Sequence, residues 1–433
     1  MDPSTAGMIG LVVLVLLLFS GLPVSFVMAL VGFAGFSYVI SMEAGLRILA
    51  KDIYTSFSSY SLTVLPLFVF MGQLAFHAGI SGKLFRCAHS ILGSFRGGLA
   101  MATIGACAGF SAICGSTNAT AATMATIALP EMKKYNYSDE LATGTVAAGG
   151  SLGILIPPST IFIVYGIMTE QSIGKLFAAG ILPGILLSIL FIIAIWVVVR
   201  LDPRKGPPGP KVDLKTKLLS LTGLIDMAIL FFLVMGGLFF GFFTPTEGGA
   251  IGAFGTLLLA VVRNMINWNG FKMAVYESLR ISCMVMLIVA GATVFAHFLA
   301  VTRIPYNLAE WVSNLPLPPN GIMAIIIFVY LIGGCFMDAF GMILLTIPIF
   351  YPVILKLGFD PIWFGVVIVL VTEMGVITPP VGVNVYVVSG VAKNVPLEVI
   401  FRGIVPLLIA LLVCCALLIA FPQIPLFLPS LLR

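Results

Sequence analysis

The amino-acid sequence predicts an all-α polytopic membrane protein, and three observations lead to that class. Hydrophobic residues make up 60% of the 433 residues, charged residues make up only 9%, and the mean hydropathy is +1.16. A soluble domain carries about 25% charged residues, so a soluble fold is excluded. Stretches such as 185–199 are continuously apolar, whereas β-barrel strands alternate polar and apolar residues. At about 20 residues per crossing, the apolar runs suffice for roughly ten helices.

The chain divides into two similar halves. A hydrophilic connector rich in Pro, Lys and Arg lies near the midpoint, so we expect a first repeat over 1–201, a linker over 202–217 and a second repeat over 218–433. The run Gly153–Pro158 matches Gly375–Pro380 at an offset of 222 residues. An internal repeat with a Gly/Pro-broken segment in each half points to a secondary transporter.

The expected elements follow from apolar length and from Gly and Pro positions. In the first half we expect a re-entrant hairpin over 98–134, a broken helix over 141–168, and ordinary spans near 8–21, 23–41, 60–78 and 175–200. In the second half we expect a hairpin over 320–356, a broken helix over 361–391, and spans near 218–243, 246–262, 281–300 and 397–421. Five crossings per half make the two repeats inverted.

The distribution of basic residues predicts the orientation. If the central linker is cytoplasmic, most Lys and Arg residues lie in cytoplasmic loops, as the positive-inside rule requires. Both termini then face the periplasm or exterior, the first hairpin opens from the cytoplasm and the second opens from outside.

The stretches 43–58 and 265–280 mix charges with aromatic residues. They fit interfacial arms that brace a moving domain and ordinary loop helices equally well.

The tip of the first hairpin carries small hydroxyl and amide side chains over 114–120, with no charge. Neutral oxygens and exposed helix N-termini suit an anionic substrate and a hard monovalent cation, while the alternative is close helix packing by small residues.

The paired breaks at 153–159 and 375–381 free backbone carbonyls that could bind Na⁺. Proline kinks without ligands are the alternative there.

Two acids lie within apolar segments of the second half. Asp338 is near the tip of the second hairpin and Glu373 precedes the second break. Intramembrane acids are functional candidates by default, and for Asp338 a structural helix cap is an equal alternative.

Other polar residues receive simpler interpretations. Asp226 and Glu247 lie near span ends, where we expect them to be solvated. His77 and His297 lack acidic neighbours in the sequence, so we expect them to serve in packing or hydrogen bonding.

Catalysis is not expected. Gly149–Gly153 matches the G-x-S-x-G pattern, but that motif needs a strand, a turn and nearby His and acid residues, and this one lies within an apolar helix. The sequence has no Walker A loop and no H-E-x-x-H motif, and its seven cysteines have no metal-binding spacing. We therefore expect neither an enzyme nor a nucleic-acid-binding protein. A channel is a further alternative, although broken repeats favour alternating access.

Taken together, these motifs resemble the large membrane subunit of tripartite ATP-independent periplasmic (TRAP) transporters, the DctM-like permeases. The resemblance covers essentially the whole chain and is carried by 115–120 with 128–132, by 153–159, by 338–352 and by 377–384. It implies an elevator-type transporter of the ion-transporter superfamily type, which carries substrate and Na⁺ together and needs no organic cofactor.

The resemblance also implies the residues of two Na⁺ sites. The first site would use Ser111, Cys114, Gly153, Ile156 and Pro158, although Ser is more typical of the family at the position of Cys114. The second site would use Gly334, Gly375, Thr378 and Val381. We expect the substrate to bind between the hairpins, at Ser116, Thr117, Asn118, Ser159, Thr378 and Asn384.

By the same resemblance, the protein imports a carboxylate, such as a C4-dicarboxylate or sialic acid, across the bacterial inner membrane. Its partners in the lipid bilayer and periplasm would be a small DctQ-like membrane subunit and a DctP-like solute-binding protein. The alternative is a stand-alone Na⁺/dicarboxylate symporter, which needs no binding protein.

Overall fold

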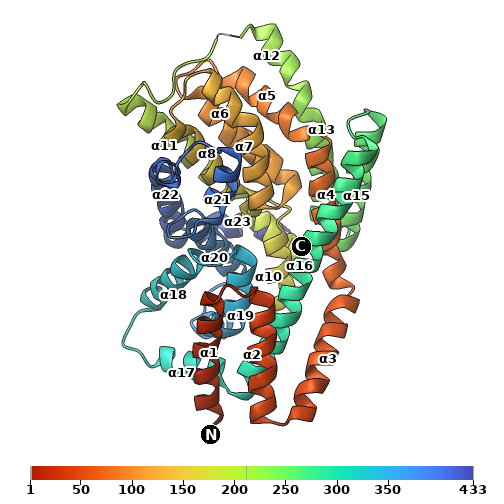
Figure 1. Ribbon diagram of the computed structural model, residues 1–433, viewed down its shortest axis with the longest axis vertical. Coiled ribbons are helices and arrows are strands. Elements are labelled where there is room, and N and C mark those ends of the chain that lie inside the picture. The colour runs from red at the N-terminus through yellow and green to blue at the C-terminus, as the bar shows by residue number, and fades with distance from the viewer. Residues whose placement is uncertain (1, 211, 433) are drawn as a thin grey trace.

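The protein is built from helices, as the computed structural model shows over the residues it describes, 2–210 and 212–432 (Figure 1). The elements of the first half are α1 (Pro3–Phe19), α2 (Val24–Val39), α3 (Met42–Ser58), η1 (Ser61–Thr63), α4 (Val64–His77), α5 (Ile80–Leu92), α6 (Gly98–Cys114), α7 (Thr117–Lys134), α8 (Asp139–Gly150), α9 (Leu152–Leu155), α10 (Thr160–Thr169) and α11 (Ile173–Leu201).

The second half begins after the hydrophilic connector. Its elements are α12 (Leu214–Ser220), α13 (Thr222–Phe231), the π-helical turn η2 (Phe232–Gly236), α14 (Gly237–Phe239), α15 (Pro245–Val262), α16 (Trp268–Val301), α17 (Ile304–Ser313), α18 (Pro319–Gly334), α19 (Ala339–Lys356), α20 (Pro361–Val376), α21 (Val383–Val391), α22 (Leu397–Ala420) and α23 (Gln423–Leu431).

Two helical hairpins enter the molecule from opposite ends. The pair α6 and α7 lies toward the end that holds α12, and the pair α18 and α19 lies toward the N-terminus (Figure 1). Each half also has a helix interrupted in its middle, α8–α10 in the first and α20–α21 in the second. The halves interlock, because α10 packs against α19 and α21 packs against α7.

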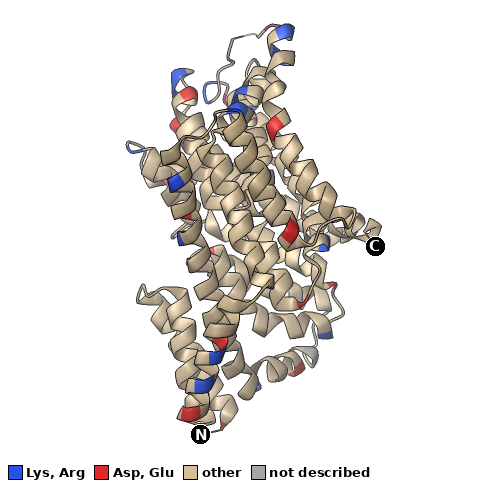
Figure 2. Ribbon diagram, turned by 90° about the vertical axis from the view of Figure 1, so that its right-hand side faces the viewer, with Lys and Arg blue, Asp and Glu red and all other residues tan. Residues whose placement is uncertain are grey.

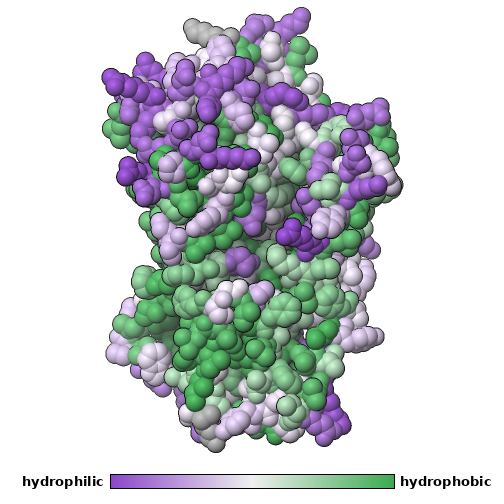
Figure 3. All heavy atoms as spheres, viewed as in Figure 1, coloured by the Kyte–Doolittle hydropathy of each residue, from purple (hydrophilic) through white to green (hydrophobic). Residues whose placement is uncertain are grey.

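Seven helices within the described residues are long and apolar enough to cross a membrane, or eight if the bent pair α3 and α4 counts as one span. Large apolar side chains are exposed along α1, α2, α13 and α15. Basic residues gather mainly at the end that holds α12, with a smaller group near the N-terminus (Figure 2). On the face in Figure 3, hydrophilic residues likewise cover the α12 end, and hydrophobic residues cover most of the opposite part.

The two stretches proposed as arms differ from each other. In the first half, α3 is separated from α4 by a bend of 56°. In the second half, the corresponding stretch is the start of α16, which runs for 34 residues without a break. Pro66 lies in the first turn of α4, where proline is tolerated, so the bend comes from the break at 59–60 and not from a proline kink.

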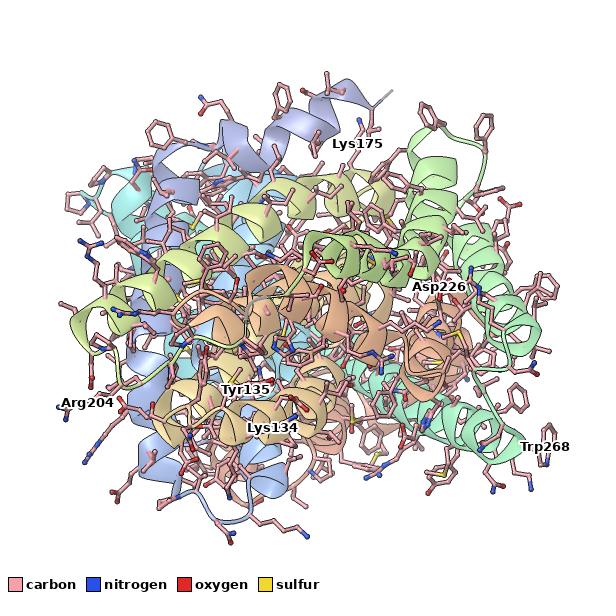
Figure 4. The ribbon with its side chains drawn as sticks, turned by 90° about the horizontal axis from the view of Figure 1, so that it is seen from above. Lys134, Tyr135, Lys175, Arg204, Asp226 and Trp268 are labelled. Atoms are coloured by element: carbon pink, nitrogen blue, oxygen red, sulfur yellow. The ribbon has the colours of Figure 1, made fainter. Side chains whose placement is uncertain are left out.

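The expectation for Asp226 was wrong. Its side chain has no exposed surface, and its carboxylate oxygens lie 2.8 Å from Lys83 Nζ and 2.7 Å from Arg263 Nη1. Figure 4 shows Asp226 among the helices, whereas Trp268 and Arg204 lie at the periphery. The reason is that α13 packs against α5, which closes over a position that the sequence places near a span end. Glu247, by contrast, is exposed as expected and forms a capping box with Thr244.

His77 and His297 contact polar partners, as expected, but these partners are acids that lie far from them in the sequence. His77 Nε2 lies 3.4 Å from Glu277 Oε2, and His297 Nε2 lies 3.3 Å from Asp52 Oδ2. Each pair joins α16 to a helix of the first half, because α16 packs along both α3 and α4. Such partners lie far away in the sequence, so a search of the neighbouring residues could not find them.

Candidate functional site

The tip of the first hairpin is a tight turn between α6 and α7. Gly115 has a φ of 62°, a left-handed conformation that glycine adopts readily, and it ends α6 after Cys114. Ser116 then caps α7, because its Oγ accepts a hydrogen bond from the Ala119 N–H at 3.4 Å. The small side chains therefore place the N-terminus of α7 inside the molecule.

The first helix break lies directly against this tip. A Cβ atom added at Gly153 would be only 2.5 Å from the Ser116 carbonyl oxygen, so the two backbones touch. Thr160 Oγ1 donates a hydrogen bond to the Gly115 carbonyl at 2.8 Å, from the far side of the cis Pro157–Pro158 bond.

The structure thus brings the residues predicted for the first Na⁺ site into one region. Cys114 ends α6, Gly153 touches the tip, and Ile156 and Pro158 lie in the extended segment between α9 and α10. The buried Ser111 lies one turn earlier in α6, where its hydroxyl donates to the Cys107 carbonyl at 2.6 Å. Their role as ion ligands stays a prediction.

The second break meets the second hairpin in the same way. A Cβ atom at Gly375 would lie 2.6 Å from the Gly334 Cα, so these two predicted ligands are in backbone contact. Thr378 follows α20, and its hydroxyl donates to the Met374 carbonyl. Val381 lies just beyond the cis Pro379–Pro380 bond. The four residues predicted for the second Na⁺ site therefore lie on two segments that touch.

Asp338 caps the second helix of this hairpin. Its Oδ2 accepts hydrogen bonds from the backbone N–H groups of Phe340 at 3.1 Å and Gly341 at 3.3 Å. The side chain also borders the central cavity, so capping and a functional role are compatible.

A cavity of about 790 Å³ separates the hairpin tips from the helices α4 and α16. Ser116, Thr117 and Asn118 line it from the first tip, and Asp338 lines it from the second. The other predicted substrate residues lie outside its described lining: Ser159 caps α10, Thr378 follows α20, and the buried Asn384 donates to the Ala147 carbonyl at 3.2 Å. Their contact with substrate stays a prediction.

Three cavity residues were missed by the sequence analysis. Gln73 of α4 and Glu277 and Arg280 of α16 face the first tip across the cavity. Arg280 is the only Lys or Arg among the described lining residues, and none of the contacts described for it is with an acid. The spacing of Glu277 and Arg280 puts both on one face of a helix, which is the signal that could have identified them.

Glu373 lies deeper, behind the first tip. Its side chain is fully buried, and Thr117 Oγ1 is 2.9 Å from its Oε2. The contact joins the second broken helix to the first hairpin and adds a carboxylate close to the cavity.

Comparison with known proteins identifies the family. Residues 11–424 match the model of the tripartite ATP-independent periplasmic transporter, DctM component. The chain belongs to this family. The resemblance found in the sequence is thereby confirmed, as is the prediction that the protein is not an enzyme. It is a multi-pass membrane permease and a component of a TRAP system.

Several relatives align over most of their length. The chain is 37% identical to the C4-dicarboxylate TRAP transporter large permease protein DctM of Pseudomonas aeruginosa, covering 89% of this chain and 90% of that protein. It is 33% identical to the sialic acid TRAP transporter large permease protein SiaM of Vibrio cholerae, over 96% of each chain. It is also 33% identical to the isethionate TRAP transporter permease protein DctMQ of Oleidesulfovibrio alaskensis, over 95% of this chain and 64% of that protein.

A solved structure shares the fold. The YdaH transporter of Alcanivorax borkumensis aligns with a TM-score of 0.63 at 15% sequence identity, covering 87% of this chain and 88% of that one. The TM-score shows a common architecture, but at this low sequence identity the similarity says nothing about substrate or mechanism. The helical, multi-span fold class is therefore established.

Proposed function

We propose that this permease imports a small organic anion, such as a C4-dicarboxylate or sialic acid, in symport with Na⁺. The observation that carries the proposal is the central cavity, where a neutral hydroxyl and amide tip faces one arginine. Arg280 offers a planar fork of donors that matches a carboxylate, and the N-terminus of α7 favours negative charge on the other side.

The two breaks support Na⁺ as the coupling ion. In the first half the hairpin tip touches the non-helical segment that contains two prolines, and in the second half the hairpin touches Gly375, just before such a segment. The prolines leave carbonyl oxygens without helical donors. Oxygen-rich, largely neutral surroundings suit a hard monovalent cation. We assign Ser111, Cys114, Gly153, Ile156 and Pro158 to one ion, and Gly334, Gly375, Thr378 and Val381 to the other.

The packing supports an elevator mechanism. The hairpins and broken helices pack on one another across the two halves and form a body that holds all proposed ligands. The cavity separates the first tip from α4 and α16, the helices that would stay fixed while this body slides. The inverted repeats supply two related end states for such a movement.

We further propose the partners and the location. The protein would lie in the bacterial inner membrane with its linker in the cytoplasm and both termini in the periplasm. A DctQ-like subunit would pack on the exposed apolar helices, as the fused DctMQ name of one relative suggests. A periplasmic DctP-like binding protein would deliver the substrate.

Uptake by proteoliposomes tests this proposal. The chain and its small subunit are reconstituted, and uptake of labelled succinate, sialic acid and isethionate is measured with and without Na⁺ and the cognate binding protein. Uptake of one anion that requires Na⁺ and the binding protein is the expected result. Uptake without the binding protein would instead indicate a stand-alone symporter, and uptake without Na⁺ would remove the coupling ion.

Thr378→Ala tests the second ion site. We expect the Na⁺ concentration for half-maximal uptake to rise roughly fivefold, which corresponds to ~1 kcal/mol for one lost polar contact. Thr256→Val is the matched control, since that buried hydroxyl only donates to the Gly252 carbonyl of its own helix. Unchanged Na⁺ activation in a well-folded Thr378→Ala protein would exclude this residue as a ligand.

A further inference from the structure

A group of polar atoms meets behind the first hairpin tip, next to the cavity that Thr117 lines. Thr117 Oγ1 lies 2.9 Å from the Gly150 carbonyl oxygen and 2.9 Å from Glu373 Oε2. The Ser151 side chain faces the same carboxylate. Asn384 is close by, because its Nδ2 would be 3.1 Å from a Cβ atom placed on Gly150. Residues of both halves therefore converge on the end of α8.

Two oxygens of this group, Glu373 Oε1 and Asn384 Oδ1, have no hydrogen-bond partner among the described residues, and both side chains are fully buried. Buried polar atoms are nearly always paired, so two such oxygens close together indicate a site for a ligand. The amide oxygen of Asn384 can only accept hydrogen bonds, and so can the carboxylate of Glu373 when it is ionised.

The negative charge of an ionised Glu373 carboxylate is not neutralised by a basic side chain. Within the described residues, the ion pairs to Lys, Arg and His involve other acids and not Glu373. An unpaired carboxylate at membrane depth is costly unless a cation or a proton neutralises it.

The chemistry of the donors selects the ion. One proton on Glu373 would supply a single donor, whereas a cation is coordinated by several lone pairs at once. Two carboxylate oxygens, two hydroxyls, an amide oxygen and a carbonyl are hard ligands that suit Na⁺. A divalent cation generally takes more than one carboxylate, and the described residues contain no group of three His, Cys, Asp or Glu side chains.

We propose that Thr117, Gly150, Ser151, Glu373 and Asn384 form a third Na⁺ site. This inference rests on the Na⁺ coupling proposed above and adds an ion separate from those at the two breaks. The site joins the start of α7 to α8, α20 and α21. Because Thr117 both lines the cavity and contacts Glu373, an ion bound here positions the hairpin tip that faces the substrate.

The direct test is the number of Na⁺ ions bound by the purified chain with its small subunit, measured by equilibrium binding of radioactive Na⁺. Glu373→Gln keeps the size of the side chain and removes its charge, so we expect one ion fewer than in the wild type. Ser151→Ala removes one neutral ligand, and we expect the affinity of one ion to fall about fivefold. This smaller change guards against misfolding of the Glu373 variant.

Thr372→Val is the control, since the neighbouring Thr372 is equally buried but its hydroxyl donates to the Ile368 carbonyl at 2.7 Å. It should bind as many ions as the wild type. If Glu373→Gln and Ser151→Ala also bind Na⁺ like the wild type, the third site does not exist, while the proposed symport stands. If the wild type binds no Na⁺, the proposed function fails first and the third site fails with it.

Discussion

The two hairpins occupy equivalent places in the two halves but differ in chemistry and surroundings. Ser116 caps α7 and Asp338 caps α19, so corresponding positions carry a neutral and a charged cap. Most of α6 is buried from Leu99 to Cys114, whereas α18 buries mainly one side, with Phe328 at 60% exposure on the other. The first hairpin is enclosed by protein, and the second has one exposed side.

The helices that precede the two hairpins are also held differently, by a buried cluster in the first half and by a surface contact in the second. The helix before the first hairpin, α5, is tied to α13 and α15 through the buried Asp226 with Lys83 and Arg263. The helix before the second hairpin, α17, is tied to α1 by a hydrogen bond at the surface, from Asn307 Nδ2 to Ser4 Oγ at 3.2 Å. The two repeats therefore share a topology, but the contacts that hold α5 and α17 differ in strength. A buried ion pair and an exposed hydrogen bond contribute different free energies to stability.

The largest effect should come from Asp226→Asn, which removes the shared partner of two cations. We expect a loss of about 3 kcal/mol in the free energy of unfolding, at the low end for buried ion pairs, because Lys83 and Arg263 retain partial exposure. Chemical unfolding in mild detergent measures it, with the exposed Glu398→Gln as the control. Equal stability of the two variants would show that the cluster does not brace α5.

Alanine at the two contact glycines should distinguish the hairpins. At Gly153 and Gly375 a Cβ atom would meet backbone of the facing tip, and overpacking costs about 1–3 kcal/mol. We expect Gly153→Ala to cost more than Gly375→Ala, because the half-exposed second hairpin can move away. Gly390→Ala is the control, since no atom lies within 4 Å of the added Cβ. The reverse order, measured by unfolding, would contradict the difference in confinement.

Asp338→Asn separates charge from capping at the second tip. Asparagine is also a good N-cap, so stability should hold while Na⁺-dependent uptake falls about fivefold, as expected for a charge worth ~1 kcal/mol at a helix N-terminus. Asp338→Ala should lose stability as well. Full uptake by the asparagine variant would reduce Asp338 to a structural cap.

The smallest effect should come from Ser4→Ala, which removes the surface brace of α17. An exposed neutral hydrogen bond contributes about 0.5 kcal/mol or less, so unfolding should barely change. If Ser4→Ala lost as much free energy of unfolding as Asp226→Asn, the contacts of α17 and α5 would contribute equally to stability.

Local features of the sequence determined the class and the broken elements. Apolar length predicts spanning helices, and the turn at Gly115 and the interruptions after Gly153 and Gly375 follow from residues that cannot continue a helix. The family was also evident from contiguous motifs. These properties depend on residues that are neighbours in the chain, so one sequence suffices to read them.

Only the tertiary structure decided which distant groups meet. Lys83 and Asp226 are 143 residues apart, and Thr117 and Glu373 are 256 residues apart. Burial of Asp226, the acidic partners of His77 and His297, and the place of Arg280 in the cavity all depend on such encounters. The physical reason is that a side chain's hydration and partners are set by the helices that pack over it, and that packing minimises the free energy of the whole chain rather than of any local segment.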